Sequence, residues 1–352
     1  MRLSMDEVLT KQKIQELHAL VKDGDRIAIV LQDDPDPDAL SSAMALRTLL
    51  GRNKLTTPIF SFTPVTRPEN CKMVRLLEIE VEPADTEILR GFDKIAMVDV
   101  QPPYFGGRLE HTHIVIDHHP GYASSNAAFE DIRTRYGSTA TIMTEYLMCA
   151  GERISERLAT ALLYGVRSDT VTMSRRVTDD DWQAFIHLYP LANYNLIQQI
   201  DRPEFPVPFA RVIARVMSRL EVQNGLIVVN LGRVERDHLI VQLAELCLQF
   251  ERAEWVAVAG KLGPNLVVAV RNPGLGRANA GELVRRLFGA IGSAGGHRHM
   301  AKAVIPLSLW RKNGYGTRDR EIEERLRLLL AAELGREAEP GESRPSNGQQ
   351  GE

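Results

Sequence analysis

Short, continuous apolar segments alternate with longer amphipathic segments through the first half of the chain. Runs such as RIAIVL indicate strands covered on both faces of a sheet, whereas apolar residues spaced by three or four indicate helices. We therefore expect helices at residues 5–22, 38–51, 68–79, 138–151 and 155–166. We expect strands at residues 26–31, 57–62, 94–100 and 112–117. Strands that alternate with helices predict an α/β fold with a doubly wound, mostly parallel sheet.

The pattern changes after residue 174 and then resumes as a second, smaller α/β unit. The prolines of DRPEFPVP interrupt a mostly helical stretch, and a new apolar run begins at GLIVVNLG. Two helices, at 237–253 and 279–291, flank an expected pair of strands at 254–263 and 265–272. The final segment is polar and rich in Pro, Gly and Glu, which is typical of disorder. We therefore predict an N-terminal domain (1–174), a helical connector (175–224), a C-terminal α/β domain (225–334) with a cleft between the domains, and a disordered tail (335–352).

Composition and charge narrow the class of protein. The chain is 44% hydrophobic and 25% charged, as in ordinary globular proteins, and its net charge of -3 predicts no general attraction to nucleic acid or membranes. Residues 225–330 nevertheless contain 16 Lys and Arg against 10 Asp and Glu. This imbalance suits an anionic substrate, although a solvated basic surface would give the same count.

The cysteines and the apolar runs bear on location. The three cysteines are widely separated, which indicates a reduced, cytoplasmic protein. The N-terminus is too polar for a signal peptide, and no apolar run approaches the roughly 18 residues of a membrane span. We therefore expect a cytoplasmic protein with no membrane partner.

Acidic residues gather where the predicted strands end. The segment IVLQDDPDPDALSS places Asp36 and Asp38 after the first strand, and Asp99 ends another. Because ligand crevices of open α/β sheets lie at the carboxyl ends of the strands, these carboxylates should meet. Further candidates are Asp117, His118 and His119 after a third strand and Asp169 after a helix.

A metal site is one explanation of this cluster, and helix capping by aspartate is the plainer alternative for Asp36 and Asp38. Oxygen ligands with one or two imidazoles suit Mn²⁺, or Mg²⁺ with less histidine. Two such ions about 3.5–4 Å apart can drive a phosphoryl displacement, with Asp99 as the candidate bridging ligand. A calcium-binding EF-hand is excluded, because Ala39 and Ala45 stand where Gly and Glu are required.

In order and spacing, DPDPDALSS, VDV, DHHPG and YGVRSDT resemble the four motifs of the DHH phosphoesterase superfamily. AGGHRHMAKAVIP resembles the signature of the DHH-associated C-terminal domain. The resemblance extends over about residues 20–310 and looks closest to the oligoribonuclease (nanoRNase) and pAp phosphatase branch.

The resemblance implies roles for individual residues. Two Mn²⁺ ions, or Mg²⁺ instead, would be held by a set of five ligands: Asp36, Asp38, bridging Asp99, His118 and Asp169. His119 would face the scissile phosphate, and Asp117 would orient an imidazole. The implied substrate-binding residues are Arg271, Gly295, Gly296 and His297.

The sequence departs from the family pattern at two positions of the first motif. Gln32 stands where a metal-binding histidine is usual, and Pro37 where a glycine is usual. A glutamine carbonyl is a weaker ligand for manganese than an imidazole nitrogen, so Gln32 is predicted to be a weak ligand.

The resemblance implies a metal-dependent hydrolase that acts through a metal-activated water. Its substrates would be short RNA oligonucleotides, pAp, or the linear product of a cyclic dinucleotide. Hydrolysis of cyclic-di-AMP, a degenerate nucleotide-binding member without catalysis, and purely structural aspartates are the alternatives. A homodimer is compatible with the sequence.

Overall fold

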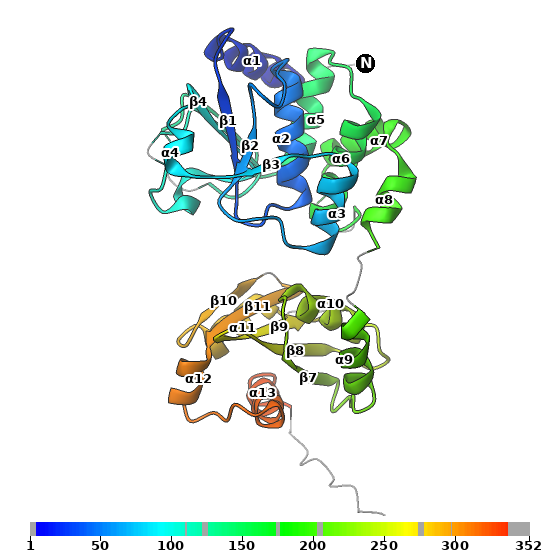
Figure 1. The fold of residues 1–352 in the computed structure, drawn as a ribbon. Helices are drawn as coiled ribbons and strands as arrows, with labels where there is room; N and C mark the ends of the chain where they lie inside the picture. Colours follow the sequence, from blue (N-terminus) through cyan, green and yellow to red (C-terminus); the bar gives the residue numbers. More distant parts are fainter. Residues whose placement is uncertain are drawn as a thin grey trace, which may run out of the picture. The chain divides into compact units, whose positions relative to one another are not determined.

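The computed structural model describes residues 5–109, 111–121, 126–173, 177–202, 207–273, 278–296 and 298–336. The chain divides into two compact units, residues 1–204 and 205–352, which are described separately (Figure 1). Among the residues that the structure describes, no helix combines the length and the apolar character needed to cross a membrane.

The first unit is built on a six-stranded sheet in which every neighbouring pair is parallel. Its strand order is β3-β2-β1-β4-β5-β6, so the chain moves outward from β1 in one direction and then in the other. This order is the doubly wound arrangement predicted from the sequence. The strands are β1 (Ile27–Leu31), β2 (Ile59–Ser61), β3 (Val81–Pro83), β4 (Lys94–Val98), β5 (Ile114–Asp117) and β6 (Phe129–Ile132).

Two separate apolar layers cover the two faces of this sheet. Along β1, Ile27 and Ile29 belong to one buried cluster, and Ala28 and Val30 to another. Because successive side chains of a strand point to opposite faces, both faces of β1 are buried. The helices and 3-10 turns of the unit are α1 (Met5–Leu20), α2 (Pro37–Leu49), α3 (Pro68–Leu76), α4 (Thr86–Leu89), η1 (Pro102–Phe105), α5 (Thr139–Ala150), α6 (Glu156–Asp169), α7 (Asp179–Leu188), η2 (Tyr189–Leu191) and α8 (Tyr194–Ile200).

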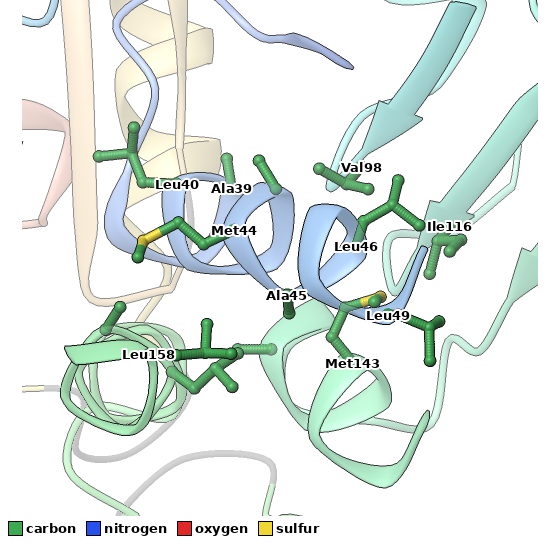
Figure 2. Packing of buried hydrophobic residues seen from close by; sticks show 14 of the residues in the cluster. Ala39, Leu40, Met44, Ala45, Leu46, Leu49, Val98, Ile116, Met143 and Leu158 are labelled. Carbon is green, nitrogen blue, oxygen red and sulfur yellow. The ribbon is translucent and has the colours of Figure 1, made fainter. Parts of the chain in front are cut away.

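Helix α2 is the centre of the larger apolar layer. Leu46 lies toward Val98 and Ile116 of the sheet, and Ala45 lies toward Met143 of α5 (Figure 2). On its other flank α2 packs tightly against α6. Gly165 of α6 makes this approach possible, because a Cβ there would overlap Ser41 Oγ and lie 3.1 Å from Pro37 O.

The second unit contains a five-stranded sheet in the order β10-β11-β9-β8-β7. β7 and β8 are parallel, and the other neighbouring pairs are antiparallel, including the predicted pair β8 and β9. The strands are β7 (Leu226–Arg233), β8 (Trp255–Leu262), β9 (Asn265–Arg271), β10 (Ser293–Gly296) and β11 (Met300–Pro306). Buried clusters on both faces of the sheet hold the helices α9 (Val207–Met217), α10 (His238–Cys247), α11 (Ala280–Phe288), α12 (Leu307–Lys312) and α13 (Asp319–Glu333).

The helical stretch expected as a connector is divided between the two units. Helices α7 and α8 pack against α6 of the first unit, whereas α9 packs against β7 of the second. Residues 203–206, within the proline-rich segment, lie outside the described residues, as do 337–352 of the expected tail.

Candidate metal centre

Three adjacent strands bring the predicted ligands to one edge of the first sheet. β1, β4 and β5 are neighbours and parallel, so their carboxyl ends lie side by side. Gln32 follows β1, Asp99 follows β4, and His118 follows β5. The site therefore forms at the position where doubly wound sheets hold their ligands.

Asp38 is held by the beginning of α5. Its carboxylate accepts hydrogen bonds from Thr139 N (2.7 Å) and Ala140 N (2.6 Å), and the side chain is fully buried. A helix N-terminus stabilises negative charge, because its first amides have no partner within the helix. This arrangement fixes the direction of the Asp38 carboxylate.

Asp99 has an unusual backbone conformation at the end of β4. Its φ of 63° is left-handed, a conformation that aspartate and asparagine tolerate better than most residues. Asp99 Oδ1 accepts a hydrogen bond from Thr139 Oγ1 (2.9 Å), and Oδ2 accepts one from Gln32 Nε2 (3.2 Å). Strain of this kind accumulates at functional sites, where the surrounding structure maintains it.

His118 presents an unsatisfied nitrogen to three carboxylates. Its Nδ1 lies 3.1 Å from Tyr136 O, which can only accept, so Nδ1 carries the hydrogen. The buried Nε2 makes no hydrogen bond with the described residues. It lies 3.8 Å from Asp38 Oδ2, 3.6 Å from Asp99 Oδ1 and 3.3 Å from Asp169 Oδ2. A lone pair facing three carboxylates requires a positive charge among them, either a proton or a metal ion.

His119 is oriented by a hydrogen-bonded chain. Gln101 Nε2 donates to Asp117 Oδ2 (2.6 Å), and His119 Nδ1 donates to Asp117 Oδ1 (2.9 Å). The Asp117 carboxylate is buried, whereas half of the His119 side chain is exposed. The imidazole can therefore offer its Nε2 to a ligand, and Asp117 acts by orienting it.

The charges at this site perturb one another strongly. Burial and the nearby Asp169 raise the pKa of Asp38 to about 7. Burial and the carboxylates of Asp38 and Asp36 raise the pKa of Asp99 well above its ordinary value. Burial lowers the pKa of His118, but Asp169 and Asp38 outweigh it and bring the pKa to about 9. Without a cation, the site therefore retains protons that exposed groups would have lost.

The residues fit divalent cations. Two groups have ligand atoms within 4.8 Å of one another, namely Asp99, His118 and His119, and Asp38, His118 and Asp169. Carboxylates with imidazole suit Mn²⁺ or Mg²⁺. The Oε1 atom of Gln32 is buried without a hydrogen-bond partner among the described residues, which leaves it able to accept a further contact.

Asp36 lies outside both of these groups. Its Oδ1 caps α2 by accepting a hydrogen bond from Ala39 N (3.0 Å). Burial and the negative charge of Asp169 raise the pKa of Asp36, so its carboxylate interacts electrostatically with the cluster. The capping alternative is realised for Asp36, and the capping bond leaves its second oxygen available to a cation.

A residue of the expected connector supports the site. Asp181 of α7 is fully buried and accepts hydrogen bonds from Gly137 N (3.0 Å) and Thr141 Oγ1 (2.6 Å). Gly137 links Tyr136, which orients His118, to the start of α5, which holds Asp38. The sequence does not reveal this role, because an aspartate three residues after Thr178 is a common helix-capping residue. Its hydrogen bond to Gly137, 44 residues away in the chain, depends on the tertiary fold.

The predicted substrate-binding residues lie at one end of the second sheet. Arg271 is 6% exposed, and its guanidinium pairs with Glu245 and donates to Val270 O (2.9 Å). Gly295 and Gly296 lie in β10, which pairs with β11 next to the Arg271 strand. The structure thus pairs Arg271 with Glu245 and places the glycines on the same sheet, so a substrate-binding role stays a prediction, while His297 lies outside the described residues.

Comparisons with known proteins relate part of the first unit to one family. Residues 26–166 match the DHH family, N-terminal domain. The uncharacterized protein MJ1633 of Methanocaldococcus jannaschii is 28% identical over 356 residues, covering 94% of this chain and 72% of that protein.

Solved structures share the fold at low sequence identity. An exopolyphosphatase-related protein from Bacteroides fragilis has a TM-score of 0.71 at 15% identity, covering 92% of this chain and 97% of that one. RecJ in complex with Mn²⁺ from Thermus thermophilus has a TM-score of 0.50 at 14% identity, covering 94% of this chain and 55% of that one.

Proposed function

Because residues 26–166 match the DHH family, N-terminal domain, we propose that the protein is a metal-dependent phosphoesterase. The observation that carries the proposal is the geometry around His118, whose Nε2 has no hydrogen-bond partner among the described residues and faces Asp38, Asp99 and Asp169. A cluster of this composition at a sheet edge suits cations and a phosphate group together.

Different residues of the site would hold the metal ions and contact the phosphate. Asp38, Asp99, His118 and Asp169 would hold two divalent ions, which when bound supply an activated water and neutralise charge on the phosphate. The hydrogen bond to Asp117 raises the pKa of His119, and the protonated imidazole would donate a hydrogen bond from Nε2 to a phosphate oxygen. We propose Mn²⁺ as the preferred ion because two histidines lie at the site, with Mg²⁺ as the competitor.

We propose short oligoribonucleotides and pAp as substrates, with linear and cyclic dinucleotides as the next candidates. Support comes from the histidine and glycine motif of the second unit and from its excess of positive charge. Arg271 would contribute only if it left Glu245, so Gly295, Gly296 and His297 are the stronger candidates for holding the nucleotide end.

Gln32 motivates a second candidate, a nucleotide-binding member without catalysis. Its amide nitrogen contacts Asp99, so in this arrangement its oxygen does not point at the shared carboxylate. If the amide keeps this orientation when ions bind, one ion loses the ligand that a histidine would provide.

The test is a hydrolysis assay with Mn²⁺ and then Mg²⁺ on di- to pentaribonucleotides, pAp, linear pApA and cyclic-di-AMP. Asp99→Asn is the inactive control, because asparagine tolerates the left-handed backbone at this position. Asp33→Asn is the matched control, because Asp33 is an exposed acid of the same loop. Turnover in the wild type and in Asp33→Asn, lost in Asp99→Asn, supports the proposal. If no substrate is cleaved with either ion while metal still binds, the non-catalytic alternative stands.

A further inference from the structure

The second unit has a positively charged cavity at the end of its sheet opposite to Arg271. The cavity has a volume of about 480 Å³, which lies within the range of small-molecule sites. Arg233, Lys261 and Arg311 line it, together with Val234, Leu307 and Thr317. Arg271 and Asn265 are at opposite ends of β9, so the cavity lies about 20 Å from Arg271 along the strand.

Hydrogen bonds among five segments hold the walls of the cavity together. Val234 N donates to Lys261 O (3.0 Å), which joins the end of β7 to β8. Leu307 N donates to Pro264 O (2.9 Å), which fixes α12 to the turn between β8 and β9. Lys261 Nζ donates to Thr317 O (3.3 Å) and so anchors the loop before α13. The cavity is therefore formed before any ligand arrives, which lowers the entropic cost of binding.

A bulge in β7 directs one of the cationic side chains. The pairing of β7 with β8 shifts register between Asn230 and Arg233, and Gly232 adopts a left-handed φ of 77°. Asn230 supports the bulge, because its Oδ1 accepts from Gly232 N (3.1 Å) and its Nδ2 donates to Asp319 O (3.0 Å). Bulges re-aim side chains and are frequent beside functional sites. Here the bulge immediately precedes Arg233, which lines the cavity.

The charges in the cavity are only partly balanced. Lys261 Nζ forms an ion pair with Asp319 Oδ1 (2.6 Å). In the described part of the chain, this is the one ion pair made by a cationic residue that lines the cavity. Arg311 donates to Leu307 O (3.4 Å), a neutral acceptor. Within the described ranges, Arg233 and Arg311 have no carboxylate partner, and no carboxylate residue lines the cavity. Two guanidinium groups without counter-ions face one cavity, and guanidinium is the group best suited to bidentate contact with phosphate.

We propose that this cavity binds a small ligand carrying a phosphate or diphosphate group, at a site separate from the metal centre. Arg233 and Arg311 contact the phosphate oxygens, Lys261 contributes positive charge, and Val234 and Leu307 form an apolar wall for the remainder of the ligand. The site binds without chemistry and requires no metal, so it is independent of the proposed hydrolysis.

The experiment is calorimetric titration of the full-length protein with pyrophosphate in the presence of EDTA, which removes metal-dependent binding at the first unit. We expect saturable binding with a Kd below about 1 mM. Arg233→Gln combined with Arg311→Gln should weaken it about tenfold or more, because both charge-assisted contacts are lost. Lys312→Gln is the matched control, because it removes one exposed positive charge next to Arg311 that does not line the cavity.

Parallel titrations with ADP identify the ligand class. Tighter binding of ADP than of pyrophosphate, lost in the double variant, assigns a nucleotide; equal affinity assigns the phosphate group alone. The proposal is overturned if the wild type shows no saturable binding, or if the double variant binds as the wild type does. Both arginines are exposed, and thermal melting of each variant confirms that the fold is retained.

Discussion

The side-chain amide of Gln32 donates a hydrogen bond to Asp99 Oδ2 over 3.2 Å, from the position where a histidine was expected. The contact orients the carboxylate at the centre of the cluster, but it leaves Gln32 Oε1 buried and unsatisfied among the described residues. An atom in this condition costs free energy unless a cation or water reaches it.

Gln32→His should therefore tighten metal binding. An imidazole at this position replaces an amide oxygen with a stronger ligand for manganese, and we expect the weaker of two Mn²⁺ sites to gain about tenfold in affinity. Electron paramagnetic resonance of free Mn²⁺ measures the change directly. Gln32→Ala is the control and should weaken binding, because Asp99 loses its orienting contact. Equal affinity in all three proteins would show that residue 32 does not contact the ions.

Asp181→Ala should weaken metal binding, although Asp181 is not itself a predicted metal ligand. The carboxylate holds Gly137 N and Thr141 Oγ1, and the loop it anchors orients both His118 and Asp38. Supporting residues of this kind typically change metal affinity by about 10–100-fold.

The measurement for Asp181→Ala is Mn²⁺ affinity compared with Asp179→Asn, which changes an exposed acid of the same helix turn. Because the substitution also removes buried hydrogen bonds, thermal melting should be recorded beside it. A stability loss with unchanged Mn²⁺ affinity would assign Asp181 to folding alone.

The metal-free protein should lose stability as the pH rises from about 4 to 9. Asp38 has an ordinary pKa of 3.8 and a folded-state pKa of about 7, so between these values the folded state binds more protons than the unfolded state. Stability falls with pH wherever that holds. His118 extends the loss, because its folded-state pKa of about 9 exceeds its ordinary value of 6.5.

Chemical unfolding in EDTA across this pH range tests the sign. Adding Mn²⁺ should restore stability most at the alkaline end, where the cation replaces the missing protons. Asp99→Asn should flatten the profile by removing one of the repelling carboxylates. A metal-free protein that becomes more stable between pH 5 and 8 would contradict the prediction.

Arg133→Ala should destabilise the fold and leave the metal centre unchanged. Arg133 is 8% exposed and bonds to the buried Asp131 and the half-buried Glu145, and both carboxylates would lose their cationic partner. Loss of one partner from a buried ionic network typically costs about 3–5 kcal/mol. Denaturant unfolding measures the cost, and Mn²⁺ titration of the folded variant should give the wild-type affinity.

The sequence revealed the central strands better than the peripheral ones. β1, β4 and β5 are long apolar runs buried on both faces, and the ligands follow them directly. β3 and β6 were missed because they are short, carry polar residues and flank the sheet, so no periodic pattern marks them.

Only those residues of the candidate site whose side chains are of a metal-binding type could be predicted from the sequence. Asp38, Asp99, His118 and Asp169 are chemically conspicuous, and the structure brings them together. The supporting residues are less conspicuous. Backbone groups of Thr139 and Tyr136 contact Asp38 and His118, and Asp181 contacts a segment that is distant in the sequence. The substrate-binding role of Arg271 stays a prediction, and nothing in the sequence shows that Glu245 lies beside it.

The close approach of α2 and α6 at Gly165 has a consequence for ion size. Asp38 begins one helix and Asp169 ends the other, so two carboxylates of one candidate site are carried by a single rigid pair. Separating the two helices to admit a larger ion would disrupt this close packing. Mg²⁺ requires ligand distances of about 2.0–2.1 Å and Ca²⁺ about 2.3–2.6 Å, so a closely packed helix pair would select ions by their radius rather than by their charge.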